Sequence, residues 1–186
     1  ARLGRDLDEP EVELRRARAV DRPDARLACA LVLPAAAAGP APVAVLLTGS
    51  GAQDRDSDSI GPGGIKLGLL RAVASALGQA GVATLRCDDR GVGDSTGDFG
   101  AATVDTFIDD ARAMVAAVRA DPRVDPARVS LVGHSEGAVV AAAVAARDPR
   151  VVAVALLAGP GRPVEQVLLE QVALTLARAG LTAAEA

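Results

Sequence analysis

The pentapeptide Gly-His-Ser-Glu-Gly at 133–137 stands between an apolar, β-branched run at 128–132 and a run of small apolar residues at 138–144. This pattern predicts a strand that turns into a helix within one residue. Such a reversal brings backbone against backbone, so a Cβ at Gly133 or Gly137 would collide with it. Ser135 is expected to have strained backbone angles and an exposed hydroxyl in front of a helix N-terminus, which makes it the candidate nucleophile.

Apolar runs alternate with segments of helical periodicity along most of the chain. Strands are predicted at 43–47, 82–87, 128–132 and 151–157, and helices at 65–80, 104–120, 135–147 and 164–179. Crossovers of this length favour right-handed βαβ units, and therefore a mainly parallel α/β sheet with helices on both faces. Strands at 12–20 and 25–33 add an N-terminal antiparallel hairpin. We expect residues 1–160 to form the core and 161–186 to begin a cap or lid helix.

Composition excludes several classes of function. A formal net charge of −4 and an aromatic content of 1% leave neither the positive charge nor the rings that nucleic acids need, so nucleic acid is not an expected partner. No apolar stretch reaches the roughly 18 residues of a membrane span, and a soluble protein is expected. The chain begins with Ala1, which predicts a cut N-terminus and leaves the compartment, cytoplasmic or secreted, open.

Two cysteines, Cys29 and Cys87, lie in separate apolar runs. They have neither Cys-x-x-Cys spacing nor histidines with which to bind a metal. We expect both to be buried, reduced thiols.

The loop after the strand at 43–47 is the candidate second half of an oxyanion hole. A carbonyl attacked by Ser135 develops negative charge, which the backbone N–H of Glu136 can meet because it begins a helix. The second donor is predicted to be the N–H of Ser50, with that of Gly51 as the other choice, because glycines let this loop turn its amides inward.

Two nucleotide-binding alternatives fit the glycine-rich segments less well. Gly49 and Gly51 open like a dinucleotide fingerprint, but Asp54 stands where the third glycine is needed, and no helix begins immediately. The stretch 61–66 has the composition of a phosphate loop without the Lys-Ser/Thr ending.

The polar stretch 88–99 contains several aspartates, but their spacing does not match a calcium loop, and no metal site is predicted. We expect its Asp and Gly residues to shape turns, and Arg90 to pin the loop through a salt bridge or bonds to carbonyl groups. None of these carboxylates is expected to be catalytic.

Four segments, LLTGSGAQDRD at 46–56, RCDDRGVGDSTGDF at 86–99, LVGHSEGA at 131–138 and LLAGPGRP at 156–163, occur in this order. Together they resemble the α/β-hydrolase superfamily, specifically bacterial serine esterases of the dienelactone-hydrolase-like and serine-aminopeptidase-like branches. The resemblance implies a serine hydrolase that cleaves small carboxylic esters, or thioesters or peptides, through an acyl-enzyme on Ser135. It implies oxyanion donors at Glu136 and Ser50, and no cofactor.

The chain departs from this superfamily downstream of the nucleophile. The catalytic order there is serine, acid, histidine, but the only histidine is His134, inside the turn itself. Adjacent residues in a tight turn point their side chains apart, so His134 is not expected to reach the Ser135 hydroxyl. We expect the chain to stop before the strands that carry the acid and the base. The alternative is a non-catalytic domain that binds an acyl or carbonyl ligand or a protein partner.

Overall fold

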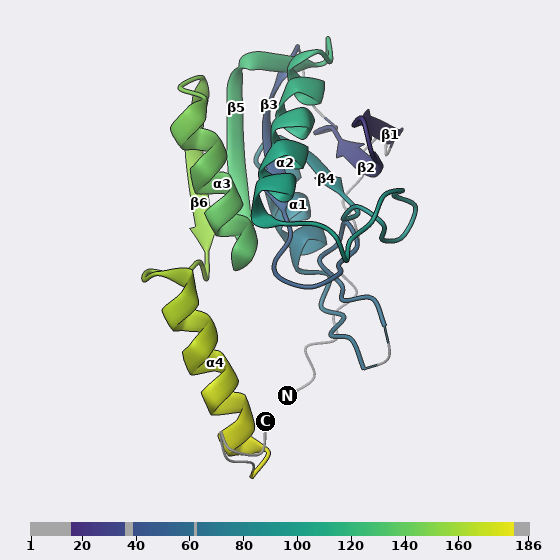
Figure 1. Cartoon of the computed structure of the whole chain (residues 1–186). Helices are drawn as coiled ribbons and strands as arrows, with labels where there is room; N and C mark the ends of the chain where they lie inside the picture. The colour runs from purple at the N-terminus through teal and green to yellow at the C-terminus, as the bar shows by residue number, and fades with distance from the viewer. Residues whose placement is uncertain (1–15, 36–38, 62, 181–186) are drawn as a thin grey trace.

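The computed structural model describes residues 16–35, 39–61 and 63–180, which form six strands and four main helices (Figure 1). The strands are β1 (Arg16–Asp21), β2 (Arg26–Val32), β3 (Ala41–Leu47), β4 (Ala83–Cys87), β5 (Val124–His134) and β6 (Val151–Leu157). The helices are α1 (Leu69–Gln79), α2 (Val104–Arg119), α3 (Glu136–Arg147) and α4 (Val164–Arg178).

All six strands belong to one sheet in the order β1-β2-β4-β3-β5-β6. The four strands from β4 to β6 pair in parallel, whereas β1 pairs with β2, and β2 with β4, in antiparallel. The predicted α/β class, the mainly parallel sheet and the N-terminal antiparallel hairpin are therefore confirmed.

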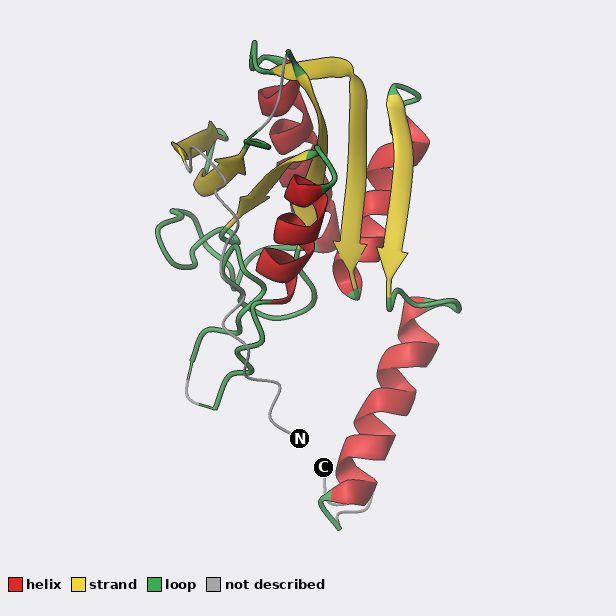
Figure 2. Cartoon of the chain, turned by 180° about the vertical axis from the view of Figure 1, so that it is seen from behind, coloured by secondary structure: helices red, strands yellow, loops and turns green. Residues whose placement is uncertain are grey.

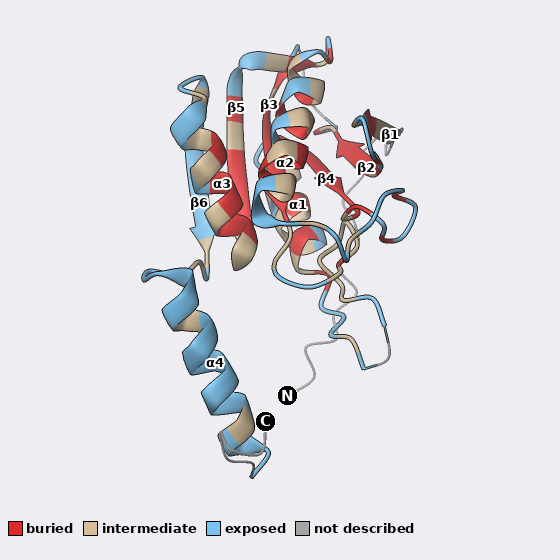
Figure 3. Ribbon diagram, in the orientation of Figure 1, coloured by how far each residue is buried: buried red, intermediate tan, exposed pale blue. Residues whose placement is uncertain are grey.

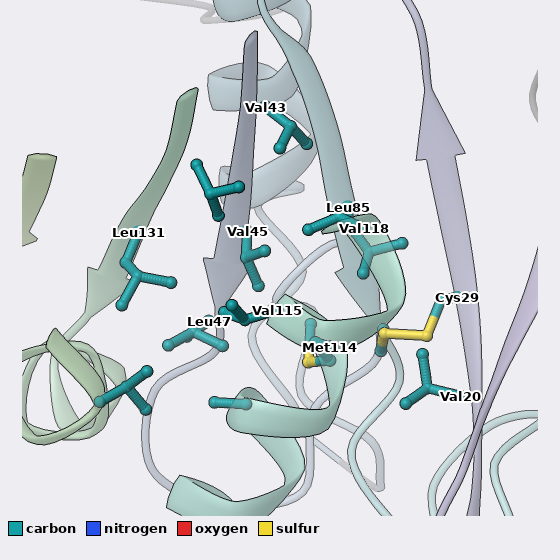
Figure 4. Packing of buried hydrophobic residues seen from close by; sticks show 14 of the residues in the cluster. Val20, Cys29, Val43, Val45, Leu47, Leu85, Met114, Val115, Val118 and Leu131 are labelled. Carbon is teal, nitrogen blue, oxygen red and sulfur yellow. A yellow bond between two sulfur atoms is a disulfide. The ribbon is translucent and has the colours of Figure 1, made fainter. Parts of the chain in front are cut away.

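The apolar run of β3 is buried on both faces because alternate side chains enter two separate cores. Val43, Val45 and Leu47 face a cluster that includes residues of α2 and α3 (Figure 4). Ala44 and Leu46 face a second cluster with α1. Figure 2, from behind, shows the same arrangement, in which helices cover both faces of the sheet. Because successive side chains of this central strand point alternately into the two cores, both of its faces are buried, and no polar side chain interrupts the apolar run.

Some element boundaries differ from the predicted ones. Helix α1 begins at Leu69, not at 65, because Gly68 is in the left-handed conformation with φ 57°. Ile65 and Leu67, which looked like its first turn, are instead exposed. Strand β5 begins at Val124, four residues early, and pairs there with Ala41 across a register shift. The predicted strand start at 12–15 lies outside the described residues.

Cys29 and Cys87 form a disulfide, so the expectation of two reduced thiols is wrong (Figure 4). The two residues are 58 positions apart, and they lie directly opposite each other where β2 pairs with β4. No local pattern predicts this pairing, because β2 is also the partner of β1 and its second neighbour is decided by the order of the sheet.

The last two elements are exposed (Figure 3). Strand β6 is at the edge of the sheet, and its side chains Val152, Val154 and Leu156 reach solvent. Helix α4 has no buried residue and extends away from the sheet (Figures 1 and 3). Assignment of 161–186 to a cap stays a prediction. None of the helices in the described ranges is long and apolar enough to cross a membrane.

Candidate active site

Ser135 lies in the sharp turn that joins β5 to α3. Its backbone angles, φ 53° and ψ −115°, are in a region that residues with a side chain rarely occupy. Two hydrogen bonds hold it there: its N–H donates to the carbonyl of Leu157 at 2.9 Å, and its own carbonyl accepts from the N–H of Ala138 at 3.0 Å. The strained conformation expected from the Gly-x-Ser-x-Gly pattern is present.

The glycines that flank the turn are there because no Cβ fits. A Cβ on Gly133 would lie 2.0 Å from the carbonyl oxygen of Gly137. A Cβ on Gly137 would lie 2.3 Å from the carbonyl oxygen of Thr48, beyond the end of β3. The turn therefore packs backbone to backbone against itself and against the neighbouring strand.

The loop after β3 lies against this turn. Strands β3 and β5 are parallel neighbours, and Leu47 pairs with Gly133, so both strands end at the same edge of the sheet. A Cβ on Gly49 would be 3.2 Å from the Cβ of Ser135 and 3.0 Å from Nδ1 of His134. The structure thus brings the segment that contains Ser50 and Gly51 next to Ser135, as the sequence predicted.

The side chain of Gln53 crosses the inside of this loop, a contact that sequence reasoning missed. Its Oε1 accepts from the N–H of Gly49 at 3.3 Å and from Oγ of Ser57 at 2.6 Å, and its Nε2 donates to the carbonyl of Ser50 at 2.9 Å. Across the described parts of the chain, no protein acceptor pairs with the N–H groups of Ser50 and Gly51. These two amides are available to a ligand.

Asp89 closes the same loop from the side of β4. Its Oδ1 accepts from Oγ1 of Thr48 at 2.6 Å, and its Oδ2 from the N–H of Gln53 at 2.9 Å. Burial raises the pKa of Asp89 to about 7, although the bonds from Thr48 and Gln53 act in the opposite direction; the charges of Asp88 and Glu136 raise it further. In the sequence, the feature that could have pointed to Asp89 is its place just after the central strand β4, at the edge of the sheet where β3 and β5 also end.

Arg90 attaches the polar loop 88–99 to helix α2. Its guanidinium is buried and makes two bonds to Asp110, at 2.9 and 2.8 Å, and one to Asp24 at 2.8 Å. The bonds to Asp110 are the main reason that the pKa of Arg90 is raised. The carboxylate of the neighbouring Asp88 accepts hydrogen bonds from the guanidinium of Arg55, and it likewise holds loop segments together.

A groove of about 380 Å³ opens beside Ser135. One wall is formed by the start of α3, with Glu136 and Val139, and the other by the start of α4, with Val164 and Leu168. The groove combines apolar side chains with the candidate nucleophile, which suits a small molecule with an apolar part.

No general base is placed at Ser135 by the described residues: no side chain there accepts a hydrogen bond from its hydroxyl. His134 has a buried Nδ1 that lacks a hydrogen-bond partner among these residues. Nor do the described ranges contain a group of three or more His, Cys, Asp or Glu side chains arranged to hold a metal.

Comparison with known proteins places these features in a family. The serine aminopeptidase family, S33, matches residues 64–183. No curated protein sequence matches the chain significantly.

Many solved structures share the fold. An α/β serine hydrolase without a lid from Xanthomonas campestris is 28% identical with a TM-score of 0.60, over 80% of this chain and 63% of its own. The esterase Est1E from Butyrivibrio proteoclasticus, in complex with ferulic acid, is 24% identical with a TM-score of 0.61, over 74% of this chain and 51% of its own. A hypothetical protein from Pseudomonas aeruginosa is 21% identical with a TM-score of 0.64, over 97% of this chain and 60% of its own. The chain thus spans between about half and two thirds of the length of these three proteins.

Proposed function

The chain belongs to the serine aminopeptidase S33 family, within the α/β-hydrolase superfamily, and from this we propose that it is a serine hydrolase with Ser135 as its nucleophile. The observation that carries the proposal is the strained turn at Ser135, with φ 53°, against which the glycine-rich loop after β3 is packed. A non-catalytic turn has no need to hold a serine at these backbone angles.

In the proposed reaction, Oγ of Ser135 attacks the carbonyl carbon of the substrate and loses its proton to a general base. The carbonyl oxygen becomes an oxyanion, which accepts hydrogen bonds from the N–H of Glu136 and from that of Ser50, or of Gly51 in its place. Collapse of this intermediate expels the alcohol, thiol or amine and leaves an acyl group on Ser135, which water then removes.

The general base and its acid partner are proposed to come from outside these 186 residues. His134 is fixed at the end of β5 and its Nδ1 faces Gly49, on the loop after β3. Loss of one triad member typically costs about 10⁴- to 10⁶-fold in turnover. Ser135 therefore needs a partner that the described residues do not supply.

A carboxylic ester is the proposed substrate class. The structural neighbour from Butyrivibrio is an esterase that holds a carboxylic acid, ferulic acid, and another neighbour is a serine hydrolase without a lid. The groove beside Ser135, with its apolar wall from the start of α4, offers space for one side of such an ester.

The proposal is tested by covalent labelling of the full-length protein with a fluorophosphonate. Labelling is expected in the wild type, and should be lost in Ser135→Ala without loss of folding. Ser130→Ala, on strand β5 that leads into the turn, is the matched control and should label like the wild type. Labelling that survives Ser135→Ala would place the nucleophile elsewhere.

A further inference from the structure

We propose that Asp89 is a positioning residue for the oxyanion loop, the segment 48–53, and that it does so by clamping both ends of the loop at once. This inference rests on the proposed function for its catalytic consequence, whereas the clamp itself is a property of the fold.

The clamp consists of hydrogen bonds from one carboxyl group to the two ends of the loop. One carboxyl oxygen binds the hydroxyl of Thr48, where β3 ends, at 2.6 Å, and the other binds the N–H of Gln53 at 2.9 Å. A third bond, from the N–H of Asp89 to the carbonyl of Gln53 at 3.1 Å, fixes the carboxyl group relative to the loop. The ends of the loop are thus held at one point, and the residues between them must arch outward.

The arch is held from within by Gln53, whose backbone Asp89 binds. The Gln53 side chain occupies the N–H of Gly49 and the carbonyl of Ser50, which prevents Gly49 from serving as a donor. Among the described residues, no protein acceptor pairs with the N–H groups of Ser50, Gly51 and Ala52. Asp89 therefore decides, through Gln53, which amides of the loop face the position beside Ser135.

A negatively charged Asp89 beside the oxyanion loop would repel a developing oxyanion, so the protonation state of Asp89 matters. Asp89 is partly buried, and its charged neighbours Asp88 and Glu136 are both acidic. All of these favour the neutral acid. A neutral acid still forms hydrogen bonds with Thr48 and Gln53. Because it carries no negative charge, it does not repel the oxyanion that the amides stabilise.

Amide hydrogen exchange tests the clamp without any need for activity. In Asp89→Leu, which has neither oxygen, exchange at the hydrogen-bonded amides of Gly49 and Gln53 should become at least about tenfold faster, while amides of β3 and β5 keep their protection. Thr48→Val removes only the hydroxyl group and replaces Asp89→Leu as the test variant if Asp89→Leu does not fold. A smaller acceleration of exchange is expected for it.

Asp89→Asn keeps the oxygen that accepts from Gln53 and should exchange like the wild type. Asp98→Asn, an exposed turn residue on the same polar stretch, is the control. Unchanged exchange in both Asp89→Leu and Thr48→Val would overturn the clamp.

Kinetics on a carboxylic ester then separate positioning from general stability. Asp89→Leu and Thr48→Val should lower kcat by about 10- to 100-fold with KM within about twofold, and Asp89→Asn should restore kcat. Equal losses in Asp89→Asn and Asp89→Leu would show that the charge, not the clamp, is required. If the wild type neither labels nor hydrolyses, the proposed function fails, and the exchange experiment still decides the clamp.

Discussion

At the scale of single residues, the candidate site depends on two positions, 133 and 137, at which no side chain fits. Ser135 keeps its unusual backbone angles because Gly133 and Gly137 leave no side chain in the way, and because Leu157 and Ala138 supply the two hydrogen bonds that hold it. Strain of this kind, on the order of 1–3 kcal/mol, persists only where the surroundings impose it. Here the surroundings are two strands and the helix that follows.

Replacement of Gly137 by alanine should therefore be costly. The added Cβ would meet backbone carbonyl oxygens of Thr48 at 2.3 Å and Leu47 at 2.6 Å, neither of which can move without shifting β3. We expect the free energy of unfolding to fall by about 3 kcal/mol, measured by urea denaturation. The control is Gly39→Ala, because a Cβ at Gly39 meets nothing within 4 Å. Equal stabilities for the two variants would contradict this account.

The raised pKa of Asp89 should be visible in the stability of the protein. Asp89 has a pKa of about 7 in the folded state, above the roughly 3.9 of an unfolded chain, so the native state holds the proton more tightly. The contribution of Asp89 to the free energy of unfolding therefore falls as the pH rises from about 4 to about 7, and it does not change further above that range. Solvent screening and the roughly 1.4 kcal/mol per pKa unit limit the loss to at most about 4 kcal/mol.

The measurement is the free energy of unfolding against pH for the wild type and for Asp89→Asn. The difference between the two proteins isolates Asp89 from other titrating groups, such as Asp121 and Asp148, whose pKa values are lowered to about 2. Wild type minus variant should decline through the window from pH 4 to 7. A constant difference would mean that Asp89 ionises normally.

At the scale of elements, pairings between strands distant in sequence bring the site's parts together. Strand β4 lies between β2 and β3, and it delivers Cys87 to the disulfide, and Asp89 to the oxyanion loop immediately beyond its end. Arg90 then attaches the following loop to α2 through Asp110. One short strand therefore connects the N-terminal hairpin, the candidate site and a helix.

Reduction of the disulfide should weaken this connection. Closure of a loop with a sequence separation of 58 is worth about 4 kcal/mol in the chain-entropy account. Addition of a reductant should lower the free energy of unfolding of the wild type by up to about that amount, as followed by denaturation with and without the reductant. The double variant Cys29→Ala and Cys87→Ala should not respond. Two free thiols in the unreduced native protein, found by thiol titration, would contradict the pairing.

At the scale of the whole molecule, the sheet ends at β6 in an edge strand with exposed apolar side chains. Strand β1 of the hairpin forms one edge, and β6 forms the other edge with Val152, Val154 and Leu156 exposed. Helix α4 leaves this edge and buries no side chain. An exposed apolar edge strand is a template for pairing with another chain.

The 186-residue chain by itself should accordingly associate through β6 as its concentration rises. Light scattering after size-exclusion chromatography should show mass that increases with concentration, and Val154→Lys should suppress it. Ile60→Lys, which places the same charge on an exposed loop residue, should have little effect. A wild-type chain that stays monomeric at all concentrations would remove β6 as an association surface.

The sequence by itself determined the parts of this protein that depend on near neighbours. Period-two burial, helical periodicity and the Gly-x-Ser-x-Gly turn come from steric rules that act within a few residues, and they predicted the parallel sheet, the strained Ser135 and the segment that meets it. The exact starts of α1 and β5 were missed, because Gly68 and the pairing of Val124 with Ala41 overrode the local pattern.

The tertiary structure alone decided the contacts whose partners are far apart in the chain. The disulfide joins residues 58 apart, and the carboxyl group of Asp89 binds Thr48 and Gln53 at separations of 41 and 36. Each of these contacts exists because β4 is placed between β2 and β3. That order is set by how all the strands and helices bury their apolar faces together, which no single segment of the sequence encodes.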